Sequence, residues 1–132
     1  MAGTITVTRN KIYGDDKKNV IEKVTATCVA DSADGSFPVA QIPLHGEILR
    51  IVTNPGATAP TDNWDFILGD PDDNALDVIV AAGANRDTAT TEQIKPLINS
   101  NVLKISGVHA LTITGNSVNS ANIEIHFYMQ VG

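Results

Sequence analysis

The sequence predicts an all-β fold, namely an antiparallel β-sandwich or jelly roll of about seven or eight strands in a single domain spanning residues 1–132. The chain contains 13 threonines, 10 glycines and 6 prolines, a composition that favours strands and turns over helices. Apolar and polar residues alternate in several short segments, which is typical of strands with one buried face. Turn-forming residues separate these segments at short intervals, as in small antiparallel domains.

The length, charge and cysteine content narrow the classes of function. A mass of 14.0 kDa suits one domain with one core, and the net charge of -6 argues against nucleic acid and anionic membranes as partners. The apolar runs are far shorter than the roughly 18 residues of a membrane span. No secretory signal is recognisable at the N-terminus, so we expect synthesis in the cytoplasm. The single cysteine excludes an internal disulfide.

Alternation predicts the first two strands. In residues 4–8, Ile5 and Val7 share one face and three threonines the other. Residues 20–29 continue this pattern and place Cys28 on the face that we expect to be buried. Residues 13–19 mix charges of both signs with a glycine and are predicted to form an exposed turn.

The next segment contains two prolines. Residues 37–44 are interrupted by Pro38 and Pro43, and because proline cannot donate to a ladder, we expect this segment at a sheet edge or outside the sheet. Residues 46–53 are predicted to form a strand, because the nearly continuous apolar run at residues 48–52 is expected where both faces are at least partly covered. Arg50 within this run must reach solvent, a carboxylate or a neighbouring chain.

The remaining chain is predicted to contain a hairpin, a long loop and three more strands. Residues 64–68 and 75–80 flank a polar hairpin tip. Residues 83–92 lack an apolar period and are predicted to form a long surface loop with at most one helical turn. The last strands are expected at residues 101–106, 111–114 and 122–131, the final one with its odd-numbered residues facing inward.

Candidate chemistry is sparse. Asp70, Asp72 and Asn74 have the spacing with which a calcium loop begins, but the glycine and glutamate that complete an EF-hand are missing, so a solvated turn is the preferred interpretation. No motif of a nucleophile, phosphate loop or dinucleotide site is present. The three histidines are scattered: His126 is expected to point outward from a strand, and His45 and His109 to lie in turns. We therefore expect no enzyme activity, no metal and no cofactor.

Three further residues have two interpretations each. Trp64 is flanked by polar residues, as in sites that stack sugars, but packing in the core is the preferred interpretation because aromatic residues make up only 5% of the chain. Arg50 and Arg86 are two of three arginines, and arginine is favoured at protein interfaces. For each arginine, an interface contact and simple solvation remain open.

Two segments resemble a family of small structural proteins of tailed bacteriophages. They are residues 45–65 (HGEILRIVTNPGATAPTDNWD) and residues 83–93 (GANRDTATTEQ). The resemblance covers the middle third of the chain, whereas the flanking strands are similar only in length and alternation. It implies a virion component made in the host cytoplasm. No functional residue can be transferred from the family.

Small β-rich phage proteins of this size are commonly capsid decoration or cement proteins, so the resemblance suggests a homotrimer that binds the major capsid protein or another virion protein. A tail or head-fibre accessory protein and a host-surface glycan-binding module remain alternatives. Edge segments are the expected contacts. The residues predicted at the interface are Thr4, Ile5, Thr6, Phe37, Pro38, Arg50, Asn85, Arg86 and Asp87.

Overall fold

The computed structural model describes residues 1–12 and 20–131. Within these ranges the chain is all-β, without a helix, which confirms the predicted class. The strands are β1 (Thr4–Lys11), β2 (Ile21–Val29), β3 (Ala40–Pro55), β4 (Asp65–Leu68), β5 (Glu92–Ile94), β6 (Leu97–Ile98), β7 (Asn101–Val102), β8 (Lys104–Thr114) and β9 (Asn122–Gln130).

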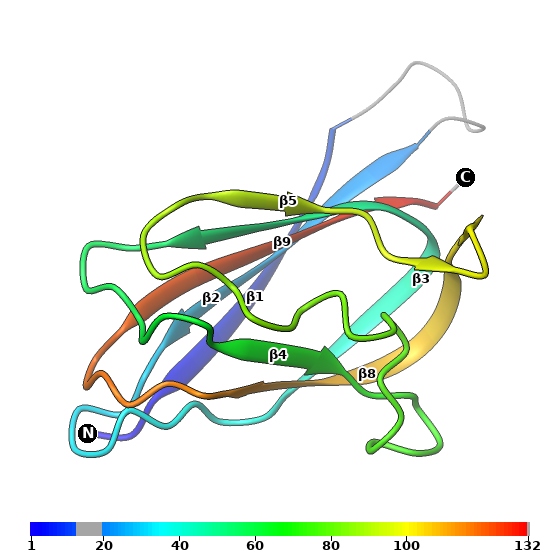
Figure 1. Cartoon of the computed structure of the whole chain (residues 1–132). Coiled ribbons are helices and arrows are strands. Elements are labelled where there is room, and N and C mark those ends of the chain that lie inside the picture. Colours follow the sequence, from blue (N-terminus) through cyan, green and yellow to red (C-terminus); the bar gives the residue numbers. More distant parts are fainter. Residues whose placement is uncertain (13–19, 132) are drawn as a thin grey trace.

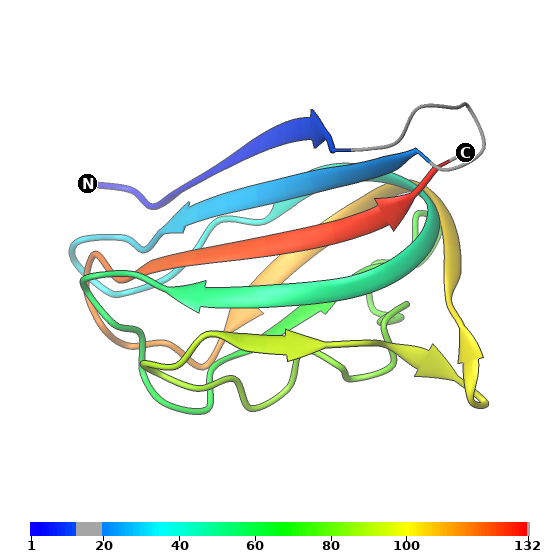
Figure 2. The same cartoon turned by 90° about the horizontal axis from the view of Figure 1, so that it is seen from above.

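Seven of these strands form one antiparallel sheet (Figure 1). Six of them follow the order β1-β2-β9-β3-β8-β4, and the seventh, β5, pairs with β3. The strands β6 and β7 form a separate short hairpin. Figure 2 shows β1, β2, β9 and the second part of β3 side by side in a twisted layer. The outer edge of β1 is therefore one end of the sheet.

The long strand β3 changes partner along its length. Its residues 40–47 pair with β8, whereas residues 47–55 pair with β9. The change occurs next to Gly46, whose φ of 111° lies in a region that side chains rarely adopt. Pro43 lies in the first part, where β9 does not pair. Among the residues that the structure describes, the strand therefore has a ladder partner on one side only at this point, which explains why a proline is tolerated in a strand that is otherwise central.

The core is one cluster of buried side chains contributed by most strands of the main sheet. On β9 the odd-numbered residues from Ile123 to Met129 point inward, as predicted, but the prediction is wrong for Val131, which follows the strand and is 39% exposed. Cys28 is also buried, as predicted, and burial raises the pKa of its thiol to about 12. The fully buried large side chains are Trp64, Phe66, Phe127, Ile42, Leu44, Ile48, Ile51, Leu68, Ile79, Leu111, Ile123 and Ile125.

The prediction of a strand at residues 75–80 is wrong. This segment consists of turns, with one isolated bridge between Gly69 and Asp77. The Asp77 carboxylate accepts hydrogen bonds from the backbone N–H groups of Leu68, Ile79 and Ala81 at 3.1, 3.2 and 2.9 Å. Since side-chain bonds of this kind compete with ladder bonds, the chain turns here although its composition favours a strand.

Other boundaries also differ from the expectation. The strand predicted at residues 101–106 is split between β7 and β8, and the strand predicted at 111–114 is the end of β8. The short strands β5 and β6 were not predicted, although residues 83–91 do form the expected loop without a helical turn. The turn predicted at residues 13–19 lies outside the described residues.

Candidate functional site

Three of the predicted interface residues lie on β1. Thr6 pairs with Thr27 of β2, and no described segment pairs with the opposite edge of β1. Thr4 and Thr6 are exposed, whereas Ile5 is half-buried and packs against the core. The strand therefore presents an open backbone edge and a threonine face, while its apolar face holds it onto the sheet.

Phe37 and Pro38 lie at the same end of the molecule as the start of β1. The chain before them passes close to Gly3, because a Cβ atom on Gly3 would lie 2.9 Å from the Ser36 carbonyl oxygen. Phe37 is half-buried and packs against the core, so it also has a structural role. Pro38 is exposed and Val39 is 56% exposed. The exposed surface here is formed by residues 38 and 39.

Arg50 is held by contacts within the chain. Its guanidinium carbon lies 3.9 Å from the centre of the Tyr128 ring, and Nη1 donates a hydrogen bond to Gln93 Oε1 at 2.7 Å. This contact combines stacking on an aromatic face with a hydrogen bond across β3, β5 and β9. Although the residue is exposed, its contacts with the described part of the chain include no carboxylate.

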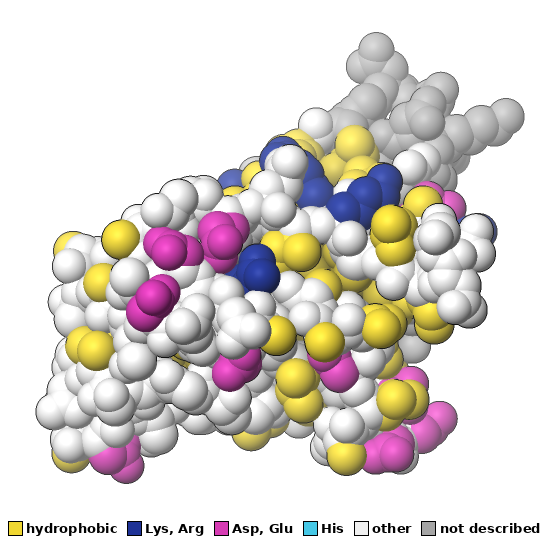
Figure 3. Space-filling model, in the orientation of Figure 1, with side chains coloured by type: hydrophobic (Ala, Val, Ile, Leu, Met, Phe, Trp, Pro, Cys, Tyr) yellow, Lys and Arg dark blue, Asp and Glu magenta, His cyan; other side chains and the backbone are white. Residues whose placement is uncertain are grey.

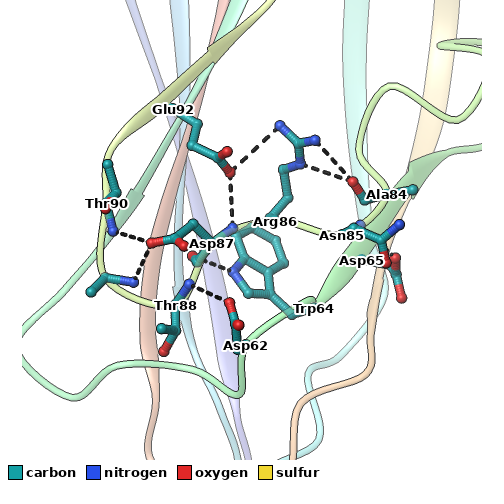
Figure 4. A network of polar contacts seen from close by, with 11 residues as sticks. Asp62, Trp64, Asp65, Ala84, Asn85, Arg86, Asp87, Thr88, Thr90 and Glu92 are labelled. Atoms are coloured by element: carbon teal, nitrogen blue, oxygen red, sulfur yellow. Dashed lines mark hydrogen bonds and ion pairs between the residues drawn. The ribbon is translucent and has the colours of Figure 1, made fainter.

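The loop that carries Asn85, Arg86 and Asp87 is bound to the core through Trp64 (Figure 4). The Arg86 backbone N–H donates to the Trp64 carbonyl at 2.7 Å, and the Trp64 indole Nε1 donates to the Asp87 carbonyl at 3.2 Å. The Asn85 backbone N–H donates to Asp65 Oδ1 at 2.8 Å. This stretch is therefore a fixed surface rather than a free loop.

The charged side chains of this loop also bond within the chain. Arg86 donates to the Ala84 carbonyl at 3.1 and 2.9 Å, and its Nη1 lies 3.6 Å from Glu92 Oε1. The Asp87 carboxylate accepts the backbone N–H groups of Ala89 and Thr90, and these bonds lower its pKa. Both side chains thus hold the loop in shape, and the exposed member of the predicted trio is Asn85.

The predicted interface residues fall into separate groups. The residues of β1 lie near Pro38 at one end, whereas both arginines are bound by consecutive residues of β5, Arg86 by Glu92 and Arg50 by Gln93. The structure thus joins the two segments that carry the phage resemblance through β5.

A groove of about 520 Å³ is a feature that the sequence interpretation missed. Apolar side chains of the turns after β4 and of the start of β8 line it, together with Ile98 of β6. In Figure 3, hydrophobic side chains lie beside acidic ones over the loop that follows β4. Three groove residues, Leu76, Val80 and Ile98, are 57%, 52% and 47% exposed. The groove is thus an apolar surface open to solvent.

His109 lines this groove and is 1% exposed. The expectation that it lies in a turn is wrong, because it lies in β8 among the inward-facing residues. His45 was also expected in a turn but lies exposed on β3, where Nδ1 is 3.0 Å from Ser106 Oγ. Long-range pairing between β3 and β8 places both residues.

His126 points outward from β9, as predicted, but it is only partly exposed. Burial is the first cause and the nearby Lys23 charge the second cause of a pKa lowered from 6.5, while Glu124 acts in the opposite direction. Since the unfolded chain then binds a proton more readily, stability is lost as the pH falls below 6.5 towards the folded pKa. We expect His126→Gln to flatten this part of the pH dependence, measured as urea midpoints between pH 7 and pH 5. Parallel curves for wild type and His126→Gln would contradict the assignment.

The acidic turn does not bring its side chains together as calcium ligands. Asp70 Oδ2 accepts the backbone N–H of Asp72 at 3.0 Å, and Asn74 is exposed. Among the described residues there is no group of three or more His, Cys, Asp or Glu side chains arranged to hold a metal ion. The same residues include no helix with the length and hydropathy of a membrane span.

Comparison with protein-family models, with curated proteins and with solved structures gave no match to this chain.

Proposed function

We propose that this protein is a bacteriophage virion structural protein, an outer capsid decoration or cement protein that stabilises the head by binding between capsid subunits. The observation that carries the proposal is the open edge of β1, a strand of eight residues at the end of the sheet. Such an edge offers unpaired backbone groups to another chain, and monomeric proteins usually protect it. Residues 4–8 contain neither a charge nor a proline to do so, and the charged residues of the strand, Arg9 and Lys11, lie in its last part.

The proposed architecture is a β-sandwich. One layer consists of β1, β2, β9, β5 and the second part of β3, and the other of β4, β8 and the first part of β3. Two observations support this arrangement. Buried side chains of both groups belong to one core cluster, and the Arg9 side chain on β1 donates a hydrogen bond to the Pro43 carbonyl on the first part of β3. A rigid sandwich of this kind would present its edges to neighbouring chains.

The proposed assembly is a homotrimer seated on the major capsid protein or another virion protein. A ring of identical contacts multiplies a small interface, since each chain adds to the avidity of the others for a symmetric shell. The net charge of -6 supports an outer position, because packaged DNA repels an acidic protein. We propose neither catalysis nor a cofactor.

The glycan-binding alternative has less support. Trp64 is completely buried, so it offers no ring to a sugar, and the Arg50 guanidinium lies against the ring of Tyr128. A tail or head-fibre accessory role would use the same edge strand. Labelling of virions with an antibody against this protein distinguishes the head from the tail.

The assembly can be tested with a charge on β1. We expect Thr6→Lys to raise the concentration at which the oligomer dissociates about tenfold or more, because a lysine on an edge strand opposes pairing with another chain. Thr27→Lys is the matched control, since Thr27 is the exposed cross-strand neighbour of Thr6 on an inner strand. Sedimentation velocity over a dilution series measures the effect. A wild-type protein that is monomeric at all concentrations would overturn the homo-oligomer.

Binding to the shell is a separate measurement. Shells assembled from the major capsid protein encoded in the same genome should co-sediment with the wild-type protein at a fixed ratio of copies. The Thr27→Lys protein should behave in the same way, and Thr6→Lys should reduce occupancy. Shells that do not retain the wild-type protein would overturn the decoration role.

A further inference from the structure

The groove beside β8 has the composition of a built binding site rather than of an accidental depression. Its walls are mostly apolar, with Val78 from the turns after β4 and Leu103 and Ile105 from the region of β8. Binding sites are typically apolar with a small number of placed polar groups. Here the buried polar group is the imidazole of His109, which has 1% of its surface exposed.

The hydrogen bonding of His109 leaves one ring nitrogen without a partner. Nδ1 lies 3.0 Å from the Gly69 carbonyl oxygen, which can only accept, so Nδ1 carries the proton. In the neutral ring, Nε2 is then an acceptor, and it is buried without a hydrogen-bond partner among the described residues. Because a buried polar atom without a partner is unfavourable, the site favours a donor supplied from outside.

The two carboxylates that line the groove, those of Asp70 and Asp77, both accept hydrogen bonds from backbone N–H groups of the chain, Asp70 from Asp72 at 3.0 Å. All hydrogen bonds recorded for Asp77 come from backbone N–H groups, with Leu68 and Ile79 at Oδ1 and Ala81 at Oδ2. Two further polar side chains line the groove and have partners within the chain: Ser106 Oγ lies 3.0 Å from His45 Nδ1, and Lys104 Nζ lies 3.6 Å from Glu47 Oε1. The other lining side chains apart from His109 are apolar, and contact with them disfavours a charged guest. The guest is therefore defined as an apolar body with one neutral hydroxyl donor.

The rim indicates that the guest belongs to a macromolecule. Leu76, Val80 and Ile98 are exposed around the groove, and Leu97 and Val102 of the adjoining β6–β7 hairpin are 43% and 39% exposed. A small molecule inside the groove would leave the hairpin residues uncovered, whereas a protein surface can cover both. Val80 also has a φ of 53°, an unusual conformation for a β-branched residue and one that occurs preferentially at functional sites.

We propose that this groove receives a tyrosine side chain from a partner protein, with the ring against the apolar walls and the phenolic O–H donating to His109 Nε2. The existence of a protein partner rests on the proposed structural function, whereas the argument from the chemistry of the groove does not depend on it. Because Nε2 is not exposed in the free protein, binding includes a small shift of the side chains next to it. The contact would orient the protein on its partner through the groove residues, which lie between residues 70 and 109 and are thus far from β1 in the sequence.

The test uses p-cresol and toluene as analogues of tyrosine and phenylalanine side chains. We expect p-cresol to bind about tenfold more tightly, the amount that one hydrogen bond of about 1.4 kcal/mol contributes. In NMR spectra that correlate the ring nitrogens and protons of histidine, p-cresol should shift His109 Nε2, and toluene should not. N-acetyl-tyrosinamide should reproduce the p-cresol shift, because it carries the phenol on a peptide backbone.

Matched variants place the binding site. Leu76→Glu introduces a charge at the exposed rim and should abolish binding of p-cresol, whereas Val108→Glu, at a 47% exposed position of β8 outside the groove, should not. Equal affinities for p-cresol and toluene, or an unmoved Nε2 signal, would overturn the hydrogen bond. If p-cresol binds but N-acetyl-tyrosinamide does not, the assignment of the guest to a protein side chain is overturned. These outcomes are independent of shell co-sedimentation, so failure of the groove and failure of the decoration role can be told apart.

Discussion

Trp64→Ala is expected to lower the free energy of unfolding by about 3–5 kcal/mol, the usual cost of removing a large aromatic side chain from a core. Trp64 is completely buried, and its ring centre lies 5.9 Å from that of Phe66. It also holds the loop of residues 83–91 in place, because its indole N–H donates to the Asp87 carbonyl and its backbone carbonyl accepts the Arg86 backbone N–H. Loss of the ring should therefore weaken the core and release this loop together.

Two measurements separate these effects. Urea unfolding gives the loss of stability, and hydrogen exchange reports whether the amides of Arg86 and Asp87 lose protection before the rest of the sheet. Trp64→Phe should cost less, because it keeps a ring in the core and removes only the indole and its hydrogen bond. Leu76→Ala, at a 57% exposed position, is the control and should change stability by less than about 0.5 kcal/mol. A Trp64→Ala protein with a loss below about 1 kcal/mol would contradict the placement of this ring.

The strands that were predicted well are those whose burial follows the period of two. On β9 every odd-numbered residue from Ile123 to Met129 is buried and every even-numbered one is partly exposed. On β2 the same alternation holds for Val24, Ala26 and Cys28. In such strands the local pattern and the final packing agree, so the sequence alone indicates both the strand and its inner face.

Other parts depend on contacts that are distant in the sequence. The apolar run at Val78–Val80 has the composition of a strand, but the carboxylate of Asp77 takes the backbone N–H groups that a ladder would use. The groove escaped prediction because His109 finds its Nδ1 partner at Gly69, 40 residues away. A lone histidine between small and apolar residues gives no local sign of such a partner.

Among the predicted interface residues, the sequence indicated the edge strand better than the charged contacts. Thr4 and Thr6 lie on an open edge, as their position in the first predicted strand suggested. The sequence did not decide between an interface contact and simple solvation for Arg86. In the structure its guanidinium donates to the Ala84 carbonyl and lies near Glu92. Side-chain partners of this kind depend on the loop conformation, which has no periodic signal in the sequence.

Gly46→Ala is expected to cost about 3–5 kcal/mol, because it combines backbone strain with a steric clash. Gly46 has a φ of 111°, and a Cβ atom there would lie 2.1 Å from the Gln130 carbonyl oxygen of β9. The glycine lies where β3 changes its partner from β8 to β9. Relief of the clash therefore requires β3 to move away from β9 next to the residues that pair with β8. The variant should lose amide protection first at Glu47 and its neighbours.

Gly115→Ala is the matched control for this prediction. Gly115 also has a positive φ, 80°, but the nearest atom to its Cβ position is a side-chain oxygen of Asp65 at 3.3 Å. Only the conformational cost then applies, about 1–2 kcal/mol. Urea unfolding of both variants measures the difference, and a Gly46→Ala protein that is already unfolded without urea fits the larger cost. Equal losses for the two variants would contradict the close approach of β3 to β9 at Gly46, and with it the reason why a glycine is needed where β3 changes partner.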